Sequence, residues 1–263
     1  TALSPEAFSN VTADTTFDLP DGFSGEGAVK IMDGKLFVSV SGGGRDICFT
    51  DENGRIIPHE VDTWDPNGES LVWVKVPYLT KGTKITMHWS VKPGYAVPAN
   101  DPMSVWSDYI AVWHFSDAAN GQAQDSAGHD YTATMRDGGT LGEADTAVFG
   151  AAGAAKNGSL MSSDYERSFP TEGRFTVSGW FRTPGVSTYG NSSSAIFGKK
   201  AGGARAADSL GWCGLAWSKT ELRFYTDGSD YQGKTGLADL AKNWLYAGFT
   251  LSDGSRAEGY ANG

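Results

Sequence analysis

Alternation of apolar and polar residues with a period of two is the feature that most constrains this chain. In SLVWVKVP, residues 70–77, every second position is a valine, and the residues between are Leu71, Trp73 and Lys75. In TKITMHW, residues 83–89, the alternating positions on one side are Ile85, Met87 and Trp89. Successive side chains of a strand point to opposite faces, so both segments predict half-buried antiparallel strands.

Turn residues predict that such strands are short and numerous. Asp33-Gly34 separates two apolar runs, Val29–Met32 and Leu36–Val40, and predicts a hairpin. Asn53-Gly54 predicts a second hairpin, in which the acidic residues Asp51 and Glu52 form a solvated turn rather than a reactive site. The returning strand, 55–61, contains Pro58, which predicts a sheet edge or a bulge. With 35 glycines among 263 residues, the composition fits this pattern.

Charge and hydropathy exclude several function classes. The net charge is −10 and the isoelectric point is about 4.8, so the surface would repel a nucleic-acid backbone. No apolar run of 18 residues predicts a membrane span. Cys48 and Cys213 lie in apolar surroundings and are expected to be buried, unreactive thiols. We expect a protein that does not bind nucleic acid and does not insert into a membrane; its oligomeric state is open, with a monomer favoured.

The segment Val91–Pro102 contains three prolines without periodicity and is interpreted as a linker or a long loop. We therefore expect two β-sandwich domains, residues 1–104 and 105–263, in an all-β protein. In the second domain, strands are expected in IAVWHFS (110–116), FTVSGWFR (175–182), SAIFGKK (194–200), LGWCGLAWS (210–218), ELRFYT (221–226) and WLYAGFTL (244–251).

Two resemblances to known families agree with this division. The order DICFTDENGRIIPHEVDTWD, then GESLVWVKVPYLTKGTKITMHW, resembles an uncharacterised domain of bacterial envelope and exported proteins, over about residues 25–100. The chain departs from that family at Cys48, where arginine is usual, and at Trp89-Ser90, where Tyr-Gly is usual. The resemblance implies a β-sandwich domain in a secreted or cell-envelope protein.

The motifs AVWHFSD, DSAGHDYTAT, FTVSGWFR and GYANG resemble a laminin-G-like jelly roll of the concanavalin A type, over about residues 110–263. That family adds further strands after the last of these motifs, so the jelly roll is expected to be either truncated or a reduced version. The resemblance also implies calcium held by loop carboxylates, for which Asp117, Asp125 and Asp130 are the candidates. Ordinary turn acids remain the alternative.

Catalytic motifs are sparse. The sequence has no G-x-S-x-G, H-E-x-x-H or P-loop motif, and its histidines lack metal-ligand spacing. His88 and His114 are expected at the surface, opposite the apolar strand positions. An acid-peptidase dyad would pair Asp14 or Asp62 with Asp125, because two aspartates sharing a proton can activate water.

Glycan recognition requires an aromatic platform with polar neighbours. The candidates in the second domain are Trp180, Trp212, Trp217, Tyr225 and Tyr231. Together with the resemblances, this favours an exported bacterial recognition or adhesion protein that binds extracellular glycans or glycoproteins without chemistry of its own. The alternatives are an acid-dependent, aspartic-type peptidase that degrades a host glycoprotein such as mucin, and a structural envelope spacer.

Overall fold

The structure is a computed structural model that divides into two compact units, Thr1–Ser163 (unit 1) and Asp164–Gly263 (unit 2). The residues that it describes are 29–32, 35–38, 44, 47–65, 69–88, 100–116, 121–135, 140–143, 152–154, 160–162, 174–182, 194–200, 210–226, 231–234, 236–240, 242–252 and 257–262.

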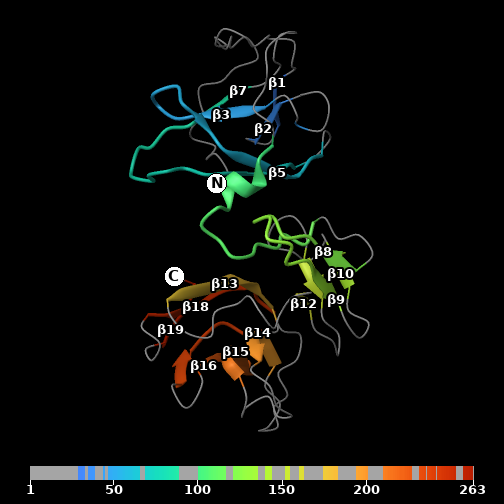
Figure 1. The fold of residues 1–263 in the computed structure, drawn as a ribbon, viewed down its shortest axis with the longest axis vertical. Coiled ribbons are helices and arrows are strands. Elements are labelled where there is room, and N and C mark those ends of the chain that lie inside the picture. Colours follow the sequence, from blue (N-terminus) through green and yellow to red (C-terminus); the bar gives the residue numbers. More distant parts are fainter. Residues whose placement is uncertain are drawn as a thin grey trace. The chain divides into compact units, whose positions relative to one another are not determined.

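The expected all-β class is confirmed. Apart from the short helix α1 (Pro102–Val105), every regular element among the described residues is a strand, and the strand pairs are antiparallel (Figure 1). Within that part of the chain, no helix has the length and apolar character needed to cross a membrane.

Hairpins organise the start of unit 1 as the turn residues predict. Strands β1 (Val29–Met32) and β2 (Lys35–Val38) pair with Met32 opposite Lys35. Strand β3 (Cys48–Thr50) pairs with β4 (Ile56–Ile57) across a turn in which Gly54 has φ +75°. The Asp51 carboxylate accepts hydrogen bonds from the backbone N–H groups of Asn53 and Arg55, so this acid shapes the turn.

Pro58 lies where the chain passes from one sheet to the next. Strand β4 belongs to the sheet β4-β3-β7, whereas β5 (His59–Thr63) pairs with β6 (Leu71–Val74). Strand β7 comprises Thr86–His88. The proline has no N–H to give to a ladder, so the change of sheet costs no backbone hydrogen bond there.

The alternating apolar positions form the core of this half of unit 1. Ile47, Phe49 and Ile57 are buried, and the residues packed against them include Val61, Val72, Val74, Ile85 and Met87. The alternation therefore predicts the core positions Val72 and Val74 of β6. It also predicts Met87 of β7 and Ile85, which precedes that strand. It leaves Glu60, Asp62 and Trp73 on the opposite face.

The remaining strands of unit 1 are short. Strands β8 (Gln122–Ala123), β9 (Ala133–Met135) and β12 (Leu160–Ser162) form one sheet, and β10 (Thr140–Glu143) pairs with β11 (Ala152–Ala154). The strand expected at 110–116 is absent, which corrects that prediction. Its backbone is used differently, because Val112 donates its N–H to the Asp125 carboxylate and accepts a hydrogen bond from the N–H of Ser126.

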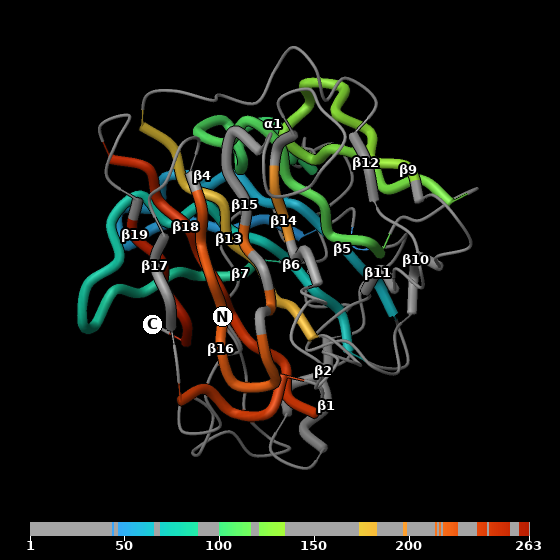
Figure 2. The backbone as a smooth tube through the Cα atoms, turned by 90° about the horizontal axis from the view of Figure 1, so that it is seen from below, coloured from blue at the N-terminus to red at the C-terminus, as the bar shows by residue number. Residues whose placement is uncertain are grey.

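Unit 2 consists of two sheets among the described residues. One has the order β13-β18-β19, with β13 (Phe175–Phe181), β18 (Leu245–Leu251) and β19 (Ala257–Ala261). The other has the order β14-β15-β16-β17, with β14 (Ser194–Lys200), β15 (Leu210–Ser218), β16 (Glu221–Thr226) and β17 (Tyr231–Lys234). Figure 1 shows the two sheets as layers, and Figure 2 shows β14, β15 and β16 side by side.

Phenylalanine rings connect these two sheets through a common core. Phe197 of β14 contacts Phe181 of β13, with ring centroids 5.4 Å apart. Phe224 of β16 and Phe249 of β18 are fully buried, and their rings stack with centroids 6.0 Å apart. Alternate side chains of β13 and β18, among them Phe181 and Phe249, thus point into the core between the two sheets.

Gly259 of β19 is required by this packing. A Cβ atom at this position would lie 2.2 Å from Cδ2 of the buried Phe224 ring. We predict that Gly259→Ala lowers the free energy of unfolding of unit 2 by roughly 1–3 kcal/mol, the usual cost of overpacking a core. Urea denaturation followed by circular dichroism measures the change.

Gly248, on the neighbouring strand β18, supplies the matched control. A Cβ there would lie 3.5 Å from Cβ of Ser178, an ordinary contact. Gly248→Ala should therefore leave the urea midpoint close to that of the unsubstituted protein. Equal midpoints for the two alanine variants would contradict the packing described above.

Candidate functional site

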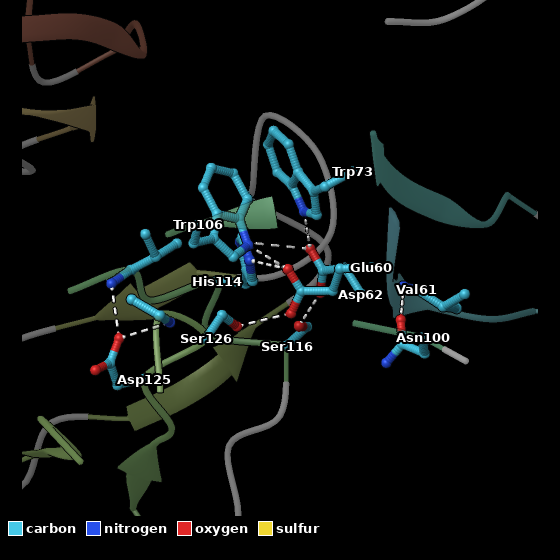
Figure 3. Close-up of polar contacts among 12 residues, drawn as sticks. Glu60, Val61, Asp62, Trp73, Asn100, Trp106, His114, Ser116, Asp125 and Ser126 are labelled. Carbon is cyan, nitrogen blue, oxygen red and sulfur yellow. Dashed lines mark hydrogen bonds and ion pairs between the residues drawn. The ribbon is translucent and has the colours of Figure 1, made fainter. Parts of the chain in front are cut away.

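Two carboxylates lie on the same face of β5 in unit 1. Glu60 and Asp62 occupy alternate positions, so their side chains project together and away from Val61, which packs on the core. Their side chains are only 7% and 4% exposed. Figure 3 shows both carboxylates pointing toward a common group of donors.

His114 lies between these carboxylates. Its Nε2 atom is 3.1 Å from Oε2 of Glu60, and its Nδ1 atom is 3.8 Å from Oδ2 of Asp62. The imidazole ring stacks on the Trp73 indole with centroids 5.1 Å apart, and it also contacts the Trp106 ring. The two indoles fix the ring plane, so both nitrogens face an acid (Figure 3).

Neutral groups donate further hydrogen bonds to each carboxylate. Glu60 accepts hydrogen bonds from the Trp106 indole N–H and from the Ser126 hydroxyl. Asp62 accepts hydrogen bonds from the Trp73 indole N–H and from the hydroxyls of Ser116 and Thr63. We refer to Glu60, Asp62, Trp73, Trp106, His114, Ser116 and Ser126 as the polar cluster.

The polar cluster holds Glu60 in its ionised form. Burial raises the pKa of the Glu60 carboxyl, but the hydrogen bonds from His114, Trp106 and Ser126, with the attraction of His114, outweigh burial, and the pKa is lowered. A carboxylate with this many donors is stable as an anion and has no shared proton to give to a substrate. The hydrogen bonds of the polar cluster therefore connect β5, β6, the end of α1 and residues 114–126.

Asp125 has a different environment from Asp62. Its Oδ1 atom accepts hydrogen bonds from the N–H groups of Val112 and Ala127, each at 2.9 Å, and its Oδ2 atom accepts that of His129 at 3.0 Å. In the described part of the chain, Asp62 and Asp125 make no hydrogen bond to each other. Asp14, the other residue proposed for the dyad, lies outside the described residues.

The calcium candidates are not gathered into one site by the structure. Asp117 lies outside the described residues. Asp125 directs both oxygens at backbone N–H groups, and Asp130 is an exposed residue with φ +60°. Among the residues that the structure describes, no group of three or more His, Cys, Asp or Glu side chains could hold a metal ion. Calcium binding therefore stays a prediction.

The histidine expectations are corrected. His88 is 6% exposed, and the His114 side chain is 10% exposed, so neither lies at the surface. Period-two alternation separates two faces but does not show whether another segment covers the second one. Cys48 is buried as expected, and burial raises the pKa of its thiol. The side chain of Cys213 is outside the description.

The outer face of the sheet β13-β18-β19 in unit 2 carries a second group of side chains. Trp180 lies opposite Tyr246 in the ladder, with ring centroids 5.5 Å apart, and the two side chains are exposed. In the next row, Ser178 lies opposite Gly248, which lies opposite Tyr260, also exposed. We call this surface, with its neighbouring residues Thr176, Thr250 and Glu258, the aromatic face.

Hydroxyl groups hold the rings of the aromatic face in place. The Tyr246 hydroxyl donates to Oγ of Ser178 at 2.9 Å, and the Tyr260 hydroxyl donates to the Glu258 carboxylate at 2.7 Å. Beyond the Trp180 row, the Arg182 guanidinium lies over the Trp244 ring, 5.3 Å from its centroid. The face therefore combines fixed aromatic rings with polar groups at its edges.

Of the five aromatic residues proposed for ligand binding, the structure places Trp180 on this face. Tyr225 is half-buried in β16, on the other sheet, opposite Tyr231 of β17. Trp212 and Trp217 are positions of β15, and their side chains, like that of Tyr231, are not described. Sequence reasoning missed Tyr246 and Tyr260, although both alternate with core positions of β18 and β19.

Comparison with known proteins gives one match. Residues 43–130 are similar to the family described as "Domain of unknown function (DUF2341)". The match confirms the resemblance to an uncharacterised domain, and its end lies at residue 130 rather than near residue 100. It contains every member of the polar cluster. No curated protein and no solved structure matches the chain.

The polar cluster makes unit 1 sensitive to loss of one charge. We predict that Glu60→Gln lowers the free energy of unfolding by roughly 3–5 kcal/mol, because the new amide N–H₂ would face the donors of Trp106, His114 and Ser126. Denaturation followed by tryptophan fluorescence measures this change. Asp108→Asn is the matched control, since that carboxylate is 79% exposed in its pair with Lys75, and it should change stability by less than about 1 kcal/mol.

Unit 1 should lose stability on acidification. Burial lowers the pKa of His59, an effect that Asp101 only partly offsets, and burial also lowers the pKa of His88. Below about pH 6.5 both histidines therefore bind protons in the unfolded chain but not in the folded protein. The free energy of unfolding accordingly decreases as the pH is lowered. The lowered pKa of Glu60 adds a further loss below about pH 4.3. A melting temperature that stays constant from pH 7 to pH 4 would contradict this.

Proposed function

We propose that this protein recognises extracellular glycans and that the aromatic face of unit 2 is the binding surface. The observation that carries the proposal is the exposed pair of Trp180 and Tyr246 on a regular sheet, with Tyr260 one row away. Exposed aromatic rings on one side of a sheet are costly in water unless they have a partner.

The chemistry of the face fits a sugar ring. The C–H groups of a pyranose pack against indole and phenol rings, and its hydroxyls require hydrogen-bond partners beside them. Ser178 and Thr176 of β13 and Thr250 of β18 provide such groups on the same face, where Thr176 and Thr250 bond each other at 2.9 Å. Tryptophan and tyrosine have few rotatable bonds, so little side-chain entropy is lost on binding.

The acid-peptidase alternative has less support. Asp62 and Asp125 are engaged with separate sets of donors, and Glu60 is held as an anion. A shared proton between two aspartates needs the opposite arrangement. The resemblance to exported bacterial domains supports a secreted or cell-envelope location for the recognition function.

Replacement of Trp180 tests the proposal. The wild-type protein should bind a subset of an oligosaccharide array, and Trp180→Ala should weaken that binding by about tenfold or more, equivalent to roughly 1.4 kcal/mol. Isothermal titration with the array ligand measures the change. Tyr246→Phe keeps the ring but removes its bond to Ser178, so it should have a smaller effect.

Tyr78→Ala is the matched control for this experiment. Tyr78 is 85% exposed and belongs to unit 1, not to the sheet β13-β18-β19 of unit 2. Its replacement should leave glycan affinity unchanged. Retention of full affinity by Trp180→Ala, or the absence of any ligand on the array, would overturn the proposal.

A further inference from the structure

The aromatic face has a cation at one end. Arg182 follows the last residue of β13 and is two positions beyond Trp180, so strand alternation places it on the same side of the sheet. Its guanidinium lies over the Trp244 ring, 5.3 Å from the centroid, and the residue is exposed. Trp244 is likewise two positions before Tyr246.

The contact with Trp244 leaves the guanidinium able to bind an anion. A cation–π contact involves the charge of the group, and the five N–H donors of a guanidinium point outward in its plane. Among the described residues, Arg182 forms no ion pair with a carboxylate that would compete for these donors. A planar guanidinium matches a carboxylate through two parallel hydrogen bonds.

The spacing between Arg182 and Trp180 suits a sugar acid. Positions two apart on one strand are separated by about 6.5–7 Å along its axis. A pyranose ring stacked on Trp180 and Tyr246 would therefore hold an exocyclic carboxylate within reach of the Arg182 side chain. At the other end of the face, Glu258 is bonded to Tyr260 and would repel an anion there, which sets one orientation.

We propose that the aromatic face is selective for glycans with a sugar carboxylate, which Arg182 binds while Trp180 and Tyr246 stack on the ring. This selectivity rests on the proposed function of the same face. The net charge of −10 opposes a polyanionic ligand at long range. Selectivity should therefore come from the local contact with Arg182, and it should weaken with added salt because the contact is exposed.

A pair of ligands that differ only in the carboxylate tests the proposal. The probes are a hyaluronan hexasaccharide and its carboxyl-reduced counterpart, in which glucose replaces each glucuronate. Wild-type protein should bind the acidic member about tenfold more tightly, because a charge-assisted bidentate contact is lost in the reduced one. Arg182→Gln should abolish this preference and leave affinity for the reduced member unchanged.

Lys219→Gln is the matched control, since Lys219 is an exposed cation in the turn between β15 and β16, and it should keep the preference. The wild type could bind both hexasaccharides with equal affinity, or Arg182→Gln could weaken the binding of both equally. Either result would overturn the proposed carboxylate selectivity but not the proposed glycan recognition. A Trp180-dependent array ligand without a carboxylate, with neither hexasaccharide bound, would do the same. Full affinity in Trp180→Ala would instead overturn the proposed function itself.

Discussion

The contact of His114 with Glu60 and Asp62 is the constraint on which unit 1 depends. Two carboxylates on one face of β5 could not be buried without hydrogen-bond donors, because an unpaired buried charge costs several kcal/mol. Those donors come from residues up to 66 positions away, at the C-terminal cap of α1, in the 110–116 segment and in the turn at Ser126. The similarity to an uncharacterised family extends to residue 130, and the sheet β5-β6 alone would leave Glu60 without its donors Trp106, His114 and Ser126.

The sequence predicts those parts of the fold that depend on local chemistry. Alternation in residues 70–77 and 83–87 identifies the core positions, and Asn53-Gly54 identifies a hairpin. Pro58 predicts a sheet edge or a bulge, and it lies where the chain passes from one sheet to the next. The same reasoning fails at 110–116, where an apolar run has the composition of a strand. There the backbone is bonded by the Asp125 carboxylate and the Ser126 N–H, and such partners are not visible in local periodicity.

The candidate sites show the same limit. Trp180 could be placed outside the core because its neighbours Val177 and Phe181 alternate clearly, and the structure leaves it exposed. Its partners Tyr246 and Tyr260 are about 66 and 80 positions further along the chain, so only strand pairing brings them together. His114 was expected at the surface for a related reason: alternation assigns a face, and only tertiary contacts decide whether that face is covered.

The polar side of a strand can therefore serve two opposite purposes in one chain. On β5 and β6, Glu60, Asp62 and Trp73 are covered, and every carboxylate contact is made by a donor from the protein itself. On β13 and β18, Trp180 and Tyr246 remain exposed among hydroxyls that can still accept or donate. A ligand can add contacts only where the protein has not already supplied them, which is why we propose recognition at the aromatic face rather than at the polar cluster.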